Sequence, residues 1–180
     1  MIGYGDGVEY RPPIPEAYEM KRESNPKIIE ILNDVLTAEL TAINQYFLHA
    51  EMCRDWGYEF LGKKIRAESI DEMRHAESLI ERVLYLNGIP NVQRLSKVSI
   101  GESVKEILEC DLALEYDALK RLNEGIPVCV AEGDNGTREL LESILKSEEE
   151  HVDWLESQLE LIAQAGLENY LASQIRKDQS

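Results

Sequence analysis

The sequence predicts an all-α fold in which four long helices form one bundle. Apolar residues recur every three or four positions along four segments, at about 28–56, 58–86, 99–132 and 137–165, as they do on the buried face of a helix. Only six prolines occur in 180 residues, and 30% of the residues are charged. This composition is typical of a globular helical domain that buries a core without disulfides.

Residues 1–24 differ from this pattern, because they show no helical periodicity. Prolines and tyrosines stand there among polar residues, namely Tyr4, Tyr10, Pro12, Pro13, Pro15 and Tyr18. Such a segment cannot build a core of its own. We therefore expect two parts, an extended N-terminal arm of residues 1–24 and a helical domain of residues 25–180.

The first helix begins with Asn25 as its N-cap and Pro26 at its first position, and Gly57 ends it. Glu39 stands inside its apolar stripe, one helical turn from Val35 on one side and one turn from Ile43 on the other. A carboxylate in such a stripe is costly unless it is paired or binds a metal.

The second helix is followed by a long crossover. Gly88 and Pro90 end the helix, and residues 87–101 show no helical periodicity. About 15 extended residues reach roughly 45 to 50 Å, whereas a helix of about 28 residues is about 42 Å long. The crossover can therefore return along the whole bundle, which lets the second and third helices run parallel.

The third helix begins near residues 99–103, where Ser99 and Glu102 resemble a capping box. Glu115 stands in its apolar stripe between Leu112 and Leu119. The fourth helix covers 137–165, and a short amphipathic fifth helix is expected at 167–175. Among residues on the outer face of the second helix, we expect Tyr58, Leu61, Leu79 and Tyr85 to need cover from neighbouring subunits.

Two helices carry the same E-x-x-H spacing, with Glu72 and His75 on one and Glu148 and His151 on the other. Residues at i and i+3 share a helix face, so each pair can bind one metal ion. A single pair is weak support, because a glutamate beside a histidine is usually solvated. Four-helix diiron proteins combine two such pairs with one glutamate from each of the other two helices.

The remaining helices supply those glutamates at the right depth. Glu39 precedes the turn at Gly57 by as many positions as His75 follows it, and Glu72 lies one helical turn before His75. Glu115 precedes the turn near residue 134 by nearly as many positions as His151 follows it. Because antiparallel helices rise equally from a shared turn, all six side chains are expected at one level of the bundle.

Carboxylates with two imidazoles suit iron or manganese better than metals that prefer thiolates. We predict a dinuclear iron site in which Glu72 and Glu148 bridge the two ions. The remaining ligands each hold one side: Glu39, His75, Glu115 and His151. Tyr46 lies two helical turns after Glu39 on the same face, where it either donates a hydrogen bond or an electron or is only a core tyrosine with a satisfied hydroxyl.

Composition excludes several other functions. A net charge of −16 opposes binding to nucleic acid or to an anionic membrane. Cys53, Cys110 and Cys129 form no C-x-x-C motif, which argues against a zinc or rubredoxin-type iron site and fits reduced thiols. We found neither a leader pattern nor an apolar run of about 18 residues, so a cytoplasmic location is expected.

Residues 25–176 resemble the bacterioferritins. The matching segments are AELTAINQYFLH at 38–49, ESIDEMRHAE at 68–77, DLALE at 111–115, EEEHVDWLE at 148–156 and GLENY at 166–170. The resemblance implies a ferritin-like bundle, a hollow shell of 24 subunits built from two-fold dimers, and ferroxidase activity with O2 or H2O2. The family's diiron ligands fall on the same six residues.

The resemblance also implies a haem, haem b or a related one, shared by two subunits through Met73. Helix geometry points Met73 roughly 130° away from the metal-binding face, out of the bundle. A ferredoxin-type reductant for iron release is a further implied partner. Some relatives carry a histidine where this chain has Ala67, so an inner-surface iron site that uses this histidine is in doubt.

Two alternatives compete with iron storage by an iron-oxidising enzyme. A rubrerythrin-like peroxidase needs an electron-delivering iron module, and the absence of C-x-x-C disfavours it. A haem-carrying shell protein without a storage role does not require six ligands at one depth.

Overall fold

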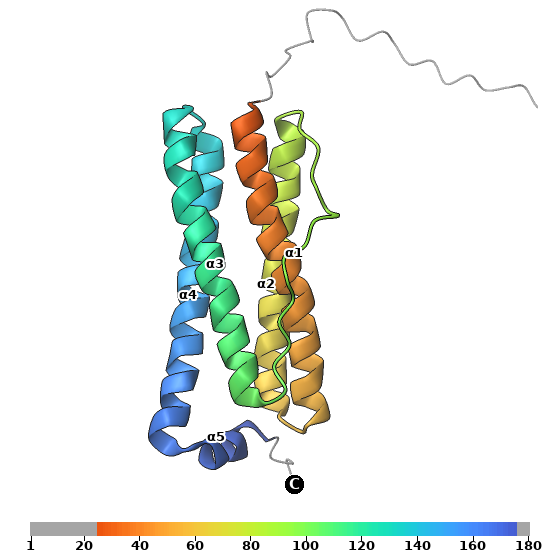
Figure 1. Cartoon of the computed structure of the whole chain (residues 1–180), viewed down its shortest axis with the longest axis vertical. Coiled ribbons are helices and arrows are strands. Elements are labelled where there is room, and N and C mark those ends of the chain that lie inside the picture. The colour runs from red at the N-terminus through yellow and green to blue at the C-terminus, as the bar shows by residue number, and fades with distance from the viewer. Residues whose placement is uncertain (1–24, 176–180) are drawn as a thin grey trace, which may run out of the picture.

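The computed structural model describes residues 25–175, which form five helices (Figure 1). They are α1 (Pro26–Asp55), α2 (Glu59–Tyr85), α3 (Val104–Ala131), α4 (Asn135–Ala165) and α5 (Leu167–Gln174). α1 and α2 run antiparallel, as do α3 and α4, whereas α2 and α3 run parallel because the crossover returns along the bundle (Figure 1). The predicted all-α bundle with a long crossover and a short fifth helix is confirmed. The expected arm of residues 1–24 lies outside the described residues.

Local sequence signals set the helix ends. The Asn25 side chain accepts a hydrogen bond from the Lys27 N–H at 3.1 Å, and Pro26 occupies the first position of α1. α3 is capped by Ser103, not by Ser99 as predicted. The Ser99 N–H donates instead to the side chain of Gln45 at 2.9 Å, so Ser99 belongs to the crossover.

The apolar core has two parts separated by a layer of buried acidic and histidine side chains. One part centres on Leu32, Leu36, Leu79, Val83, Leu122 and Leu141. The other centres on Tyr46, Leu61, Ile65, Ile107, Leu108 and Leu155. Along α1 the first part ends at Leu36 and the second begins at Ala42, with Glu39 between them. The predicted metal-binding layer therefore lies midway along the bundle, with apolar packing on both sides.

A ladder of polar side chains on α1 holds the crossover, and sequence reasoning missed it. The ladder consists of residues one helical turn apart: Asn33, Thr37, Thr41, Gln45 and His49. Its last member, His49, accepts from the Gly101 N–H through Nε2 at 3.1 Å. The Nδ1 of His49 therefore carries the proton and donates to Asp111 at 2.8 Å. The ladder satisfies backbone groups that a long crossover would otherwise leave unpaired.

Removing one rung of this ladder should destabilise the protein. Gln45 accepts from Ser99 and donates to Asp111 at 2.9 Å, so Gln45→Ala leaves a buried carboxylate short of a partner. We expect a loss of about 2–4 kcal/mol in the free energy of unfolding, measured by chemical denaturation. Asn44→Ala is the matched control, because this exposed amide bonds only the Leu40 carbonyl of its own helix. Equal midpoints for the two variants would contradict the role of the ladder.

Of the four apolar residues expected to need cover from a neighbouring subunit, Tyr85 is exposed and Tyr58 is partly exposed. Leu61 and Leu79 are fully buried, because both lie on the face of α2 that packs into the core. Large apolar side chains are also exposed at Phe47, Phe60 and Met73 on α1 and α2. No helix within residues 25–175 is long and apolar enough to cross a membrane.

Candidate metal centre

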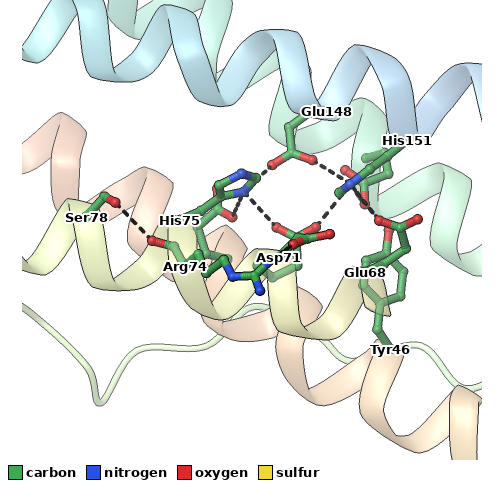
Figure 2. A network of polar contacts seen from close by, with 11 residues as sticks. Tyr46, Glu68, Asp71, Arg74, His75, Ser78, Glu148 and His151 are labelled. Carbon is green, nitrogen blue, oxygen red and sulfur yellow. Dashed lines mark hydrogen bonds and ion pairs between the residues drawn. The ribbon is translucent and has the colours of Figure 1, made fainter. Parts of the chain in front are cut away.

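Four helices bring the six predicted ligands together in the buried layer (Figure 2). Ligand atoms of Glu39, Glu72, His75 and Glu148 form one group, in which all lie within 4.8 Å of one another. A second group of the same kind joins Glu72, Glu115, Glu148 and His151. Glu72 and Glu148 belong to both groups. This arrangement provides two adjacent sites with two shared carboxylates.

The first site is organised around the Nδ1 atom of His75. It lies 3.3 Å from Oε2 of Glu39, 3.2 Å from Oε2 of Glu72 and 3.2 Å from Oε1 of Glu148. α1, α2 and α4 each supply part of this site. The i, i+3 spacing on α2 places Glu72 and His75 side by side, as helix geometry requires.

The second site is organised around the Nδ1 atom of His151. It lies 3.1 Å from Oε1 of Glu72, 2.9 Å from Oε2 of Glu148 and 3.7 Å from Oε1 of Glu115. Glu72 and Glu148 thus direct one oxygen toward each histidine. Glu39 approaches only the first histidine and Glu115 only the second. The geometry supports two bridging and two terminal carboxylates.

Unpaired buried atoms indicate that these residues fit cations. Both carboxylate oxygens of Glu39 and Glu148, Oε1 of Glu72 and Nδ1 of His151 are buried without a hydrogen-bond partner. Burying unpaired charged groups is costly unless a metal or a counter-charge compensates. Oxygen and imidazole donors are the types that iron and manganese prefer. The donor set therefore fits two divalent ions.

The acidic side chains of the centre have divergent proton affinities. Burial raises the pKa of Glu115 to about 8, although contact with His151 opposes the rise. Burial likewise raises the pKa of Glu39 well above its ordinary value, against the effect of His75. Burial raises the pKa of Glu72, but contacts with the protonated His151 and His75 outweigh it and hold the pKa at about 2.

The two histidines supply the compensating charge in the absence of metal. Burial lowers the pKa of His75, but contacts with Glu148 and Glu39 outweigh it and raise the pKa to about 12. The pKa of His151 is raised to about 12 in the same way, against burial, by contacts with Glu115 and Glu148. Both imidazoles are therefore protonated at neutral pH before metal binds, and they must lose a proton to become ligands.

Two further side chains contact the centre. Tyr46 is buried, and its hydroxyl donates a hydrogen bond to Oε1 of Glu115. Glu68, not predicted as a site residue, lies with Oε2 at 2.7 Å from Nε2 of His151, on the side away from the two sites (Figure 2). A carboxylate there orients the ring and fixes which nitrogen faces the metal. Its position one helical turn before Glu72 was the available signal.

Comparisons with known proteins agree with this geometry. Residues 29–165 match the protein family described as the ferritin-like domain. A bacterioferritin from Mycobacterium bovis is 50% identical over 150 residues, which cover 83% of this chain and 94% of that protein. This chain belongs to the bacterioferritin family. A bacterioferritin from Mycobacterium leprae is 46% identical over 158 residues, which cover 88% of this chain and 99% of that protein. One from Streptomyces coelicolor is 49% identical over 157 residues, which cover 87% of this chain and 94% of that protein.

Met73 points away from the metal centre, as predicted. Met73 is 41% exposed although its neighbour Glu72 is buried, so its side chain lies outside the buried layer. Ile70 on the same helix and Phe47 on α1 are also exposed. An exposed thioether on a helix with apolar neighbours fits a haem group whose iron binds a sulfur ligand.

Proposed function

We propose that this bacterioferritin oxidises Fe(II) at the six-residue centre and stores the ferric product as mineral in a hollow shell. Iron storage is the function that family membership supports. The observation that carries the oxidation step is the placement of Glu72 and Glu148, each with one oxygen toward each histidine. Two shared carboxylates hold two Fe(II) ions close enough to act on one oxidant molecule.

The chain binds and orients its substrate ions, while iron supplies the one-electron chemistry and O2 or H2O2 takes the electrons. Glu39 and Glu115 each complete one side of the centre. Tyr46 donates a hydrogen bond to Glu115 and thereby fixes that carboxylate. Glu68 holds the His151 ring. Apolar packing above and below the layer excludes bulk water from the ligands.

Residues 25–180 form the diiron domain of this proposal, and residues 1–24 are a separate arm. Met73 would hold a haem between two subunits, because a two-fold axis presents the same thioether from both sides. That haem would supply one-electron chemistry for the reductive release of stored iron, with a ferredoxin-type protein as the electron donor. The assembled shell of 24 subunits resides in the cytoplasm.

Assembly has its own test. The exposed apolar side chains of α1 and α2 include Phe47, Phe60 and Met73, and they are the surface that a neighbouring subunit would cover. Light scattering at neutral pH should give a mass about 24 times that of the 20.5 kDa chain. A monomer or an isolated dimer would contradict the shell.

Anaerobic titration with Fe(II), followed by addition of O2, tests the oxidation step. We expect binding to saturate near two ions per subunit and to release on the order of four protons, because both histidines and the carboxyls of Glu39 and Glu115 are protonated beforehand. Proton release should fall by about one as the pH rises through about 8, the raised pKa of Glu115. Rapid oxidation should follow once O2 is added. Saturation at one ion, or slow oxidation that matches free Fe(II), would overturn the proposal.

A further inference from the structure

A groove runs between α1 and α3, on the side where the crossover lies. It consists of a larger hollow of about 440 Å³ and a smaller hollow of about 350 Å³. Ala38, Thr41, Ser96, Cys110 and Leu114 line the larger hollow. Lys27, Ile31, Val35, Glu124 and Val128 line the smaller one. Arg121 lines both, so the two hollows adjoin.

The charged side chain between the two hollows, Arg121, already has ion-pair partners within the subunit. Arg121 contacts Asp34 on α1 through Nη1 at 2.8 Å and Asp117 on α3 through Nε at 2.7 Å. The rest of the groove includes apolar side chains such as Ile31 in the smaller hollow and Leu114 in the larger one. A groove of this shape suits an extended peptide with apolar and ring side chains.

We propose that the N-terminal arm of this chain, residues 1–24, docks in the groove of its own subunit. The arm ends where the groove begins, because α1 starts at Pro26 and the smaller hollow is lined from Lys27 onward. Its sequence offers apolar and ring side chains throughout: Tyr10, Pro12, Pro13, Ile14, Pro15, Tyr18 and Met20. Prolines lose little conformational freedom on docking, which favours such a segment.

The length of the arm matches the groove. Lys27 and Gln45 mark the two ends of the groove on α1, and the helix advances about 27 Å along its axis between these positions. An extended proline-rich chain advances about 3.1 Å per residue, so about nine residues cover this distance. With a residue or two used to reverse direction after Ser24, the larger hollow receives Ile14 and the prolines around it.

Charge is complementary near the point of attachment. Lys21 and Arg22 of the arm come shortly before α1. Three acidic residues, Glu30, Asp34 and Glu124, line the smaller hollow where these two residues would pass, and they outnumber its two basic residues, Lys27 and Arg121. Ion pairs at an exposed rim contribute little affinity, but they favour one direction of the arm over the other.

Cys110 provides a native reporter for the larger hollow. Cys53 and Cys129 are fully buried in the core, whereas Cys110 is partly exposed in the groove. Removing residues 1–24 should raise the labelling rate of Cys110 by a maleimide about tenfold, because a tethered segment has a high effective concentration. Cys110→Ser should abolish labelling in both chains. Equal labelling rates with and without the arm would overturn the proposal. Protection of Cys110 that depends on protein concentration and survives the deletion would also overturn it, because a second copy of the chain would then cover the groove.

A cross-link tests whether the arm stays within its own subunit. Under mild oxidation, Ile14→Cys should form a disulfide with Cys110 inside one chain, detected by peptide mapping of the band that runs as a monomer. Ile2→Cys is the matched control, because position 2 lies 12 residues further from α1 than position 14, well beyond the part that reaches the hollow, and should not form this bond. Disulfide-linked dimers in the Ile14→Cys variant would show that the arm covers another subunit, and no cross-link at all would show that it does not reach the groove.

Discussion

Glu148→Ala should lower the rate of Fe(II) oxidation by at least about 100-fold, because losses of roughly 10- to 100-fold already follow from removing groups that only orient metal ligands. Glu148 directs Oε1 toward His75 and Oε2 toward His151, so its loss disrupts both sites at once. His151→Ala should have a similar effect, since it removes the nitrogen donor of the second site. Stopped-flow absorbance after mixing Fe(II) protein with O2 measures the rate.

The fold should survive these changes. Glu148→Ala removes one ion-pair partner from each protonated histidine, but Glu39 and Glu72 remain beside His75, and Glu68 and Glu72 remain beside His151. Circular dichroism and light scattering should therefore match the parent. Glu149→Ala is the matched control, since this neighbour is exposed, and it should keep the parent oxidation rate. If Glu148→Ala oxidised Fe(II) as fast as the parent, the site would be wrongly assigned.

Met73→Leu should yield an assembled protein that carries no haem. Leucine keeps the apolar character of the side chain but offers no sulfur ligand to iron, and the partner subunit loses its ligand at the same time. Haem absorbance per subunit should fall to background in the visible spectrum. Iron oxidation should persist, because Met73 faces away from the diiron centre, whereas reductive release of stored iron should become slow.

Met52→Leu separates loss of the ligand from general loss of methionine. Met52 lies near the end of α1, partly buried against the core, and this substitution should leave haem absorbance unchanged. A normal haem spectrum in Met73→Leu would mean that another residue holds the haem. Loss of the spectrum in both variants would point to a defect in assembly instead.

Local signals in the chain were sufficient to predict the helices and the six residues of the centre. Helical periodicity, and for the first helix Asn25 and Pro26 at its start and Gly57 beyond its end, can be read without the fold. The depth of the ligands also followed from counting, because helices rise by a constant distance per residue and the two hairpin turns are short. Glu39 and Glu115 stood out because carboxylates are rare in apolar stripes.

The division of those residues between two sites depends on the packed bundle. The sequence suggested Glu72 and Glu148 as the bridging pair, but it did not say which terminal carboxylate lies beside which histidine. In the packed bundle Glu39 lies 3.3 Å from His75 and Glu115 lies 3.7 Å from His151. The choice of Ser103 over Ser99 as the cap of α3 also depends on a distant contact. The Ser99 N–H donates to Gln45 on α1, which keeps Ser99 in the crossover. The partner of His151 at Glu68 and the burial of Leu61 and Leu79 likewise arise from packing between helices. Contacts between distant segments are set by the whole bundle, and local sequence patterns do not record them.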